Sequence, residues 1–212
     1  MKSKNEIRRL MRRRRRSLST RERKRAARRL VDALRHHSLY RGSRHIACYL
    51  PADGEMDVRP LLDAACRDGR RVYLPVLVPG RGRSMRFRRY LPGVPLRRNH
   101  LGIPEPVGPR ATRIEPSRLD LVLTPLVAYD RQGHRLGMGG GFYDTTFRFL
   151  RGPEIWRRPR LVGIAFAFQQ LDRLPAEPWD VPLWGVATER GMRRFAHGER
   201  AEPNKGEPCN TG

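Results

Sequence analysis

Apolar residues at helical spacing characterise the first 37 positions of the chain. The positions that suit one face of a helix are Ile7, Leu10, Met11 and Leu18, followed by Ala27, Leu30, Val31 and Leu34. Ser19 and Glu22 stand between the two groups at the spacing of a capping box, which marks the start of a helix. The pattern predicts two amphipathic helices, at about 3–16 and 20–37, that pack on a core.

From residue 45 onward, short apolar runs alternate with helical segments. The runs predict strands at 45–50, 71–77, 84–90, 119–127, 161–167 and 185–189. Helices are expected at 57–67, where Gly69 follows as a stop signal, and at 142–150. The near-continuous run 121–127 is typical of a parallel strand buried on both faces. We therefore expect an α/β fold: a three-layer sandwich around a mostly parallel, Rossmann-like central sheet, with ligands at the carboxyl ends of its strands.

The composition suits one domain. The chain has 212 residues, of which 38% are hydrophobic, enough for one sizeable core. We expect a single α/β domain over 1–190, with the basic helices of 1–37 packed on it. Segment 91–118 holds six prolines and predicts a functional loop that wraps the sheet. Segment 191–212 is polar and predicts a disordered tail.

The chain shows no sign of a membrane, a secretory route or a disulfide framework. No apolar run approaches membrane-spanning length, and the basic start lacks the apolar stretch of a signal peptide, so we expect a cytoplasmic protein. The three cysteines, Cys48, Cys66 and Cys209, form no CxxC pair, which argues against zinc and favours packing thiols.

Positive charge is concentrated at the start of the chain. The formal net charge is +24, and residues 1–30 alone hold 15 Lys or Arg against 2 Glu. Five consecutive arginines at 12–16 suit a phosphate-contacting arm, but no aromatic residues are interleaved with them to stack on bases. We expect mostly a solvated arginine surface, with non-specific attraction to nucleic acid at low salt.

The run from Arg135 to Asp144 carries the strongest chemical signal. Four of its residues are glycines, which let backbone N–H groups turn toward an anion, and Asp144 offers the hard oxygen that Mg²⁺ prefers. The spacing is neither GxxxxGK[ST] nor the dinucleotide GxGxxG with its acidic partner. A tight turn without a ligand is the alternative that the glycines alone leave open.

The surrounding sequence resembles a known family. The stretch LDLVLTPLVAYDRQGHRLGMGGGFYD at 119–144 is similar to the signature of the 5-formyltetrahydrofolate cyclo-ligases, also called methenyltetrahydrofolate synthetases. Supporting stretches are YLPADGEMDVRPLL at 49–62, MRFRRYLPGVPLRRNHLGIPEP at 85–106 and VGIAFAFQQLDRLPAEPWDVPL at 162–183. The resemblance implies an enzyme that uses ATP and Mg²⁺ to convert 5-formyltetrahydrofolate to 5,10-methenyltetrahydrofolate with release of ADP and phosphate. It implies phosphorylation of the formyl oxygen and ring closure by N10. We expect a monomer, and a substrate that includes the polyglutamylated form.

The resemblance also implies residue roles. Those expected to bind ATP are Lys4, Arg8, Arg135, Leu136, Gly137, Met138, Gly139, Gly140, Gly141, Phe142 and Tyr143, with Arg135 and Tyr143 taken as catalytic. Those expected to bind the folate are Leu50, Glu55, Met138, Gly139, Gly140, Gly141 and Phe142. Asp144 and Asp180 match the two metal-associated carboxylates. Each residue alone also fits an ordinary surface, turn or core position.

Two positions depart from the family pattern. Gly140 stands where some relatives have a lysine, and Thr145 where an arginine is frequent, so two possible phosphate cations are lost. Together with the net charge, these departures keep an alternative open: a basic RNA-associated protein that retains the fold without turnover. A third hypothesis is an ATP-dependent ligase that acts on another formamide or carboxylate.

Overall fold

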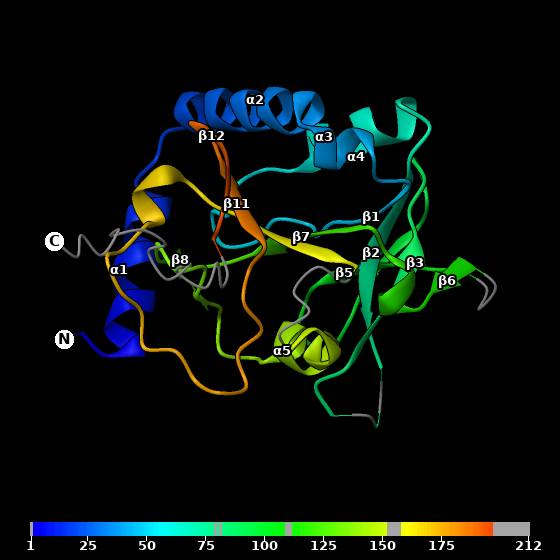
Figure 1. Cartoon of the computed structure of the whole chain (residues 1–212). Helices are drawn as coiled ribbons and strands as arrows, with labels where there is room; N and C mark the ends of the chain where they lie inside the picture. The colour runs from blue at the N-terminus through cyan, green and yellow to red at the C-terminus, as the bar shows by residue number, and fades with distance from the viewer. Residues whose placement is uncertain (1, 79, 81, 109–111, 152–157, 197–212) are drawn as a thin grey trace, which may run out of the picture.

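The architecture is built around one large mixed sheet. The computed structural model describes residues 2–78, 80, 82–108, 112–151 and 158–196. Eight strands form the sheet, in the order β12-β11-β10-β7-β1-β2-β3-β6 (Figure 1). Their bounds are Gly191–Arg194 (β12), Gly185–Thr188 (β11), Arg160–Ile164 (β10), Leu121–Pro125 (β7), His45–Ala47 (β1), Arg71–Leu77 (β2), Met85–Arg89 (β3) and Arg113–Ile114 (β6).

The five central strands are parallel and the edges are antiparallel. In the centre, β1 pairs with β2 on one side and with β7 on the other, so Ile46 lies opposite both Val72 and Leu121. Strand β10 pairs in parallel with β7 and with β11. Strands β12 and β3 run antiparallel to their neighbours β11 and β2. The parallel centre requires crossovers above or below the sheet, which places helices on its faces.

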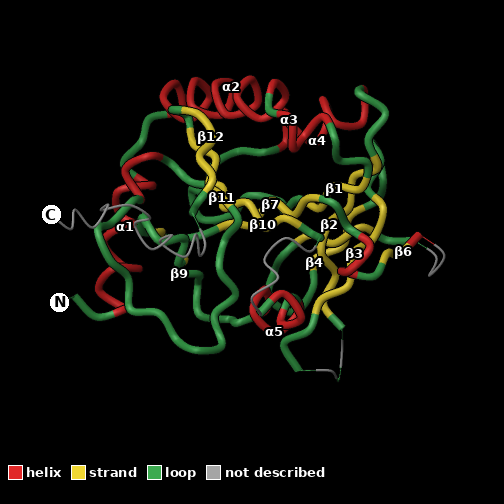
Figure 2. Tube along the Cα trace, in the orientation of Figure 1, coloured by secondary structure: helices red, strands yellow, loops and turns green. Residues whose placement is uncertain are grey.

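Helices cover both faces of the sheet (Figure 2). On the upper face in Figure 1 lie α2 (Thr20–His36), α3 (Ser38–Arg41) and α4 (Arg59–Arg67), and their apolar sides share one core cluster with alternate residues of the central strands. On the lower face α5 (Phe142–Thr146) and a 3-10 turn, η3 (Arg148–Leu150), cover a second cluster built around Phe87 and Phe147. The predicted three-layer α/β class is confirmed.

Helix α1 (Lys4–Arg16) lies at the side of these layers, apart from α2 (Figure 1). Its buried Ile7 and Met11 pack on the hairpin of β8 (Ala128–Tyr129) and β9 (Arg135–Leu136). Capping boxes begin α1 at Ser3 and α2 at Ser19, each with a glutamate three residues later. Both predicted N-terminal helices are therefore confirmed.

Several sequence predictions need correction. The helix expected at 142–150 is one turn of α-helix followed by η3. The proline-rich segment holds strands β4 (Leu96–Arg98) and β5 (Pro104–Pro106), which pair as a hairpin. Residues Gly191–Arg194, assigned to the disordered tail, form β12 because their backbone completes the sheet beside β11. The remainder of that tail, 197–212, lies outside the described residues.

Two short 3-10 turns complete the described elements: η2 (Pro116–Arg118) leads into β7, and η4 (Ala167–Gln169) follows β10. Cys48 is a buried free thiol and Cys66 a half-buried one, as expected for packing residues. None of the helices in the described part of the chain is long and apolar enough to cross a lipid bilayer.

Candidate active site

A cavity of about 1060 Å³ opens at the carboxyl ends of β1, β2 and β7. Its walls come from several separate segments: α1, the turn after β1, the ends of β2 and β7, the β4–β5 hairpin, the glycine loop, and the segment before Val181. All the residues predicted to bind ATP, folate or metal lie along this cavity. The site therefore forms where ligands bind in open parallel sheets.

The glycine loop between β9 and α5 requires its glycines. Gly139 and Gly141 have φ of 101° and 65°, values that side chains with a Cβ rarely adopt. The guanidinium of Arg8 donates from Nε to the carbonyl of Gly137 over 2.9 Å and thereby ties α1 to the loop. Because α5 has only five residues, the helix-dipole contribution expected from a longer helix is not available here.

Arg135 and Asp144 form a partly buried ion pair at the floor of the loop. The side chain of Arg135 is 5% exposed, and its Nη2 donates to Asp144 Oδ1 over 2.6 Å. Its Nη1 donates to the carbonyl of Val181, while Val181 N–H donates to Asp144 Oδ1 over 3.1 Å. Arg135 thus holds the loop against the 181 segment, and its charge lies beside the cavity that it lines.

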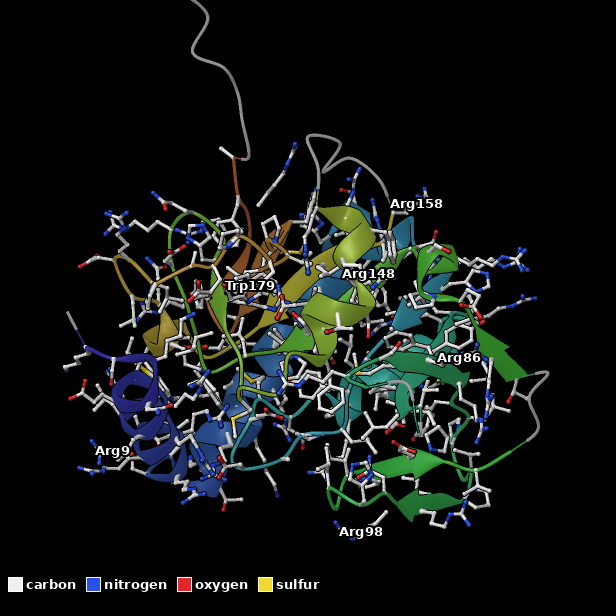
Figure 3. The ribbon with its side chains drawn as sticks, turned by 90° about the horizontal axis from the view of Figure 1, so that it is seen from below. Arg9, Arg86, Arg98, Arg148, Arg158 and Trp179 are labelled. Atoms are coloured by element: carbon white, nitrogen blue, oxygen red, sulfur yellow. The ribbon has the colours of Figure 1, made fainter. Side chains whose placement is uncertain are left out.

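Glu177 contacts both Lys4 and Asp180. Lys4 Nζ lies 3.0 Å from Glu177 Oε1, and both side chains are partly exposed. The backbone N–H of Glu177 donates to Asp180 Oδ2 over 2.9 Å. This segment also carries Trp179, an exposed aromatic residue that lines the cavity and is labelled in Figure 3.

The carboxylates fit a metal that is held partly by its substrate. Among the described residues, no group of three or more His, Cys, Asp or Glu side chains is arranged to hold a metal ion. Asp144 and Asp180 both line the cavity, and Mg²⁺ commonly takes one or two carboxylates together with substrate phosphates and water. The donor set is therefore suited to Mg²⁺ in the presence of a nucleotide.

Glu55 faces the cavity from the turn after β1. Its side chain is 11% exposed, and Ala52 N–H donates to its Oε2 over 3.1 Å. Burial raises the pKa of Glu55, while the hydrogen bond from Ala52 and the charge of Arg15 act in the opposite direction. A partly buried carboxylate of this kind accepts N–H donors from a ligand.

Aromatic residues form the wall beside α5. Tyr143 stacks against Phe147 with ring centroids 6.2 Å apart. Burial raises the pKa of Tyr143, so its phenol is neutral at physiological pH and is able to donate a hydrogen bond to a ligand. Phe142 and Leu50, both partly buried, add apolar surface to the same cavity.

Sequence reasoning missed part of the cavity. Leu101 and Ile103 line it from the tip of the β4–β5 hairpin, and each is exposed. Arg83, Arg98 and Arg151 add cations to its rim. The proline-rich composition of 91–118 indicated a functional loop, and the stretch 85–106 supported the family resemblance, but neither assigned a role to a single residue of the hairpin.

The two departures from the family pattern have a structural context. A Cβ at Gly140 would lie 2.7 Å from Phe142 Cδ2, so a side chain here requires Phe142 to move. The space around Gly141 is bounded by Arg83, whose Nη1 lies 3.4 Å from the position of a Cβ. Arg83 therefore brings a cation to the glycine loop.

The arginine run is mostly exposed at the surface, as expected, with the exception of Arg15. Arg12, Arg15 and Arg16 converge on the carboxylate of Asp53, and Arg15 is fully buried. The Arg14 guanidinium lies 4.7 Å from the ring centroid of Phe168. Most of the run therefore makes contacts within the protein.

Comparisons with known proteins agree with this geometry. A profile of the 5-formyltetrahydrofolate cyclo-ligase family matches residues 1–189. The 5-formyltetrahydrofolate cyclo-ligase of Escherichia coli K12 is 43% identical over 145 residues, which cover 68% of this chain and 76% of that protein. The Haemophilus influenzae protein of the same name is 40% identical over 148 residues, covering 69% and 76%.

Solved structures show the same fold. The 5,10-methenyltetrahydrofolate synthetase of Aquifex aeolicus, at 30% identity, has a TM-score of 0.77 and covers 95% of this chain and 97% of its own. A Mycoplasma pneumoniae synthetase, at 24% identity, has a TM-score of 0.67, covers 89% and 99%, and supports the fold alone. Because the family profile spans the described strands up to β11 and the cavity with all its walls, the chain belongs to the 5-formyltetrahydrofolate cyclo-ligase family.

Proposed function

We propose that the protein converts 5-formyltetrahydrofolate and ATP to 5,10-methenyltetrahydrofolate, ADP and phosphate. The observation that carries the proposal is one cavity, along which several segments of the chain bring together every residue that the family signature marks. A chance collection of surface cations, turns and aromatic residues would not meet in one place. Membership of the family gives the reaction, and the cavity supplies the groups that it needs.

The phosphates of ATP fit at the end of the cavity formed by α1 and the glycine loop. Lys4 and Arg8 are one helical turn apart on α1 and both line the cavity. Lys4 exchanges its contact with Glu177 for a phosphate oxygen, and the glycine loop offers backbone N–H groups at close approach. Asp144 and Asp180 would hold Mg²⁺, which neutralises charge between the phosphates when it is bound.

The pterin of the folate fits between Glu55 and the aromatic wall. The Glu55 carboxylate accepts hydrogen bonds from pterin N–H groups, while Leu50 and Phe142 contact the flat ring. Tyr143, as a neutral phenol, donates a hydrogen bond to the reacting end of the substrate. These contacts orient the formyl oxygen toward the phosphate end.

The chemistry follows from that alignment. The formyl oxygen attacks the γ-phosphorus and ADP leaves, so that a poor leaving group becomes a phosphate ester. N10 then attacks the activated carbon and loses its proton, and phosphate departs with the former formyl oxygen to leave the methenyl bridge. Positioning and charge neutralisation supply the rate, with Arg135 fixing the loop that holds the phosphates.

The test is formation of methenyltetrahydrofolate by its absorbance, with ATP, Mg²⁺ and 5-formyltetrahydrofolate. Asp144→Asn keeps an oxygen acceptor for Arg135 and Val181 but removes the negative charge, so we expect turnover to fall at least a hundredfold and to recover partly at high Mg²⁺. The matched control is Asp172→Asn, an aspartate 97% exposed that lies outside the cavity, which retains full turnover. Wild-type protein that forms no ATP-dependent product would refute the proposal.

The RNA-associated alternative receives less support from the geometry. It rested on the net charge and on the two departures at Gly140 and Thr145. Within the most basic segment, Arg12, Arg14, Arg15 and Arg16 contact other parts of the chain. The arginines labelled in Figure 3 lie at separate places across that view. Non-specific attraction at low salt, cytoplasmic location and a monomeric state remain part of the proposal.

The rim arginines suit a polyglutamate tail on the folate. Arg83 and Arg98 line the cavity beside apolar Leu101, where a chain of carboxylates leaving the site would pass. Affinity for a polyglutamylated folate is then expected to fall more steeply with salt than affinity for the monoglutamate. Equal salt dependence for the two forms would count against this part of the proposal.

A further inference from the structure

Arg15 occupies an unusual position for an arginine. It lies in the last turn of α1 with none of its surface exposed, directly behind the cavity wall. Its Nη1 is 3.4 Å from the carbonyl of Leu126 and 3.9 Å from Glu55 Oε1, and its Nη2 is 3.4 Å from Asp53 Oδ2. One buried cation thus faces both carboxylates of the turn that follows β1.

That turn is shaped to present Glu55. Asp53 and Gly54 both have positive φ, 48° and 73°, as in a type I′ turn, and Glu55 N–H donates to the carbonyl of Ala52 over 2.9 Å. A Cβ at Gly54 would lie 3.5 Å from Arg15 Cβ, so the turn packs directly on the arginine. The backbone of Arg15 therefore supports the turn from behind, and its guanidinium reaches past the turn to Glu55.

Asp53 anchors the turn from the solvent side. Its carboxylate accepts from Arg12 Nε over 2.5 Å and from Arg16 Nε over 2.7 Å, and those arginine side chains are 40% and 62% exposed. Their salt bridges are screened by water and leave the interior charge to Arg15. Arg15 is therefore the arginine of the run whose charge faces Glu55.

The charge balance around Glu55 depends on Arg15. Burial raises the pKa of Glu55, the Arg15 charge lowers it, and neighbouring Asp53 raises it again. The phenols of Tyr49 and Tyr143 also face Glu55; burial, followed by the charge of Glu55, raises the pKa of both, so both are neutral. Without Arg15, every remaining influence except the Ala52 hydrogen bond favours the protonated carboxyl, which cannot accept as many N–H donors.

We propose that Arg15 is a positioning residue for substrate recognition: it supports the Ala52–Glu55 turn and supplies the buried positive charge that faces the Glu55 carboxylate. The inference rests on the proposed function, because it takes Glu55 as the group that accepts the pterin N–H donors. It assigns a role to one of the five consecutive arginines at 12–16, which the sequence alone does not distinguish from one another.

The contacts of Arg15 are too long and too few to explain its buried charge by a contribution to stability. Its Nε is buried without an acceptor among the described residues, and its three polar contacts lie at 3.4 to 3.9 Å. Burial lowers the pKa of Arg15, but a guanidinium stays protonated in proteins. An apolar residue of similar volume would fill this position at less desolvation cost, so stability alone does not account for the charge.

The experiment compares 5-formyltetrahydrofolate binding to Arg15→Met, Arg15→Gln and Arg15→Lys by calorimetry from pH 6 to 9. Arg13→Gln is the control, since Arg13 is an exposed member of the same run. We expect the neutral variants to weaken folate binding at pH 7 about tenfold or more, because each unit by which the Glu55 pKa exceeds the pH removes about tenfold of the ionised form. Their affinity recovers as pH rises, Arg15→Lys lies near wild type, and ATP binding is unchanged throughout.

Two further results separate the possible failures. A ¹³C NMR titration of the Glu55 carboxyl needs no substrate and is expected to show a higher pKa in Arg15→Gln than in wild type. Arg15→Gln is used here because its side-chain amide still offers a hydrogen-bond donor to the Leu126 carbonyl, so the test remains possible if Arg15→Met, which offers none, fails to fold. An unchanged Glu55 titration, or an affinity loss that is the same at every pH, would overturn the role of Arg15. Wild-type protein that does not bind 5-formyltetrahydrofolate would instead refute the proposed substrate and leave the NMR result to decide on Arg15.

Discussion

Asp130 carries a fully buried carboxylate that ties together the chain just ahead of the glycine loop. Its Oδ1 accepts from the N–H groups of Gln132 and His134 over 2.9 and 3.0 Å. Its Oδ2 accepts from His134 Nδ1 and from Leu174 N–H over 2.8 and 3.1 Å. The substitution Asp130→Asn removes the charge and turns one acceptor oxygen into a donor.

The loss can be estimated from these contacts. The amide of an asparagine opposes the Leu174 N–H, which is then buried without a partner at a cost of about 1–3 kcal/mol, and the other hydrogen bonds lose their charge assistance. We expect the free energy of unfolding to fall by about 3 kcal/mol in total. For a chain of this length that lowers Tm by roughly 6–12 °C.

The lowered pKa of Asp130 determines how the stability difference between wild type and Asp130→Asn changes with pH. Burial alone would raise the pKa of Asp130 from its ordinary value of 3.8, but the hydrogen bonds from His134 and Leu174 outweigh burial and lower it. A carboxyl whose pKa is lowered by folding stabilises the protein above the unfolded-state value and loses that effect as pH falls through the folded-state value. The difference in the free energy of unfolding between wild type and Asp130→Asn is therefore constant above about pH 5 and becomes smaller below pH 3.8.

Urea unfolding followed by circular dichroism at several pH values measures this difference. Asp172→Asn, a substitution of an aspartate 97% exposed in the same region, serves as the control and is expected to change stability by less than about 0.5 kcal/mol. The reasoning is refuted if the two variants are equally stable at pH 7, or if the Asp130→Asn deficit persists unchanged at pH 3.

Three smaller perturbations test other parts of the structure. Gly140→Ala places a Cβ 2.7 Å from the Phe142 ring, so KM for 5-formyltetrahydrofolate should rise several-fold in steady-state assays while Tm changes little. Gly185→Ala places a Cβ 2.7 Å from the carbonyl oxygen of Arg193, and urea unfolding should show a loss of about 1–3 kcal/mol; an unchanged midpoint would mean that β12 is loosely held. Arg16→Ala removes the most exposed of the three arginines around the Asp53 carboxylate, so it should lower the free energy of unfolding by less than about 1 kcal/mol. In 1 M salt it should have no measurable effect, and thermal unfolding at two salt concentrations can check both results.

Local pattern in the sequence determined the elements. Helical spacing marked α1 and α2, and the capping box at Ser19 marked the start of α2, because these signals lie within a few residues of the positions they control. The continuous apolar run at 121–127 indicated a buried parallel strand, which β7 is, with β1 on one side and β10 on the other. Where packing decided the length, as at α5 and at β12, the same local signals were wrong.

The family signature identified the candidate site, and the tertiary structure decided how it is assembled. Glu55, Asp144 and Asp180 lie far apart in the chain, and the sheet brings them to one cavity. The sequence presented five identical arginines at 12–16, and only the placement of α1 against the Asp53–Gly54 turn made Arg15 a buried charge while leaving Arg16 exposed. Residue type and spacing are local properties, whereas burial and the charges facing a group depend on segments that meet only in the folded chain.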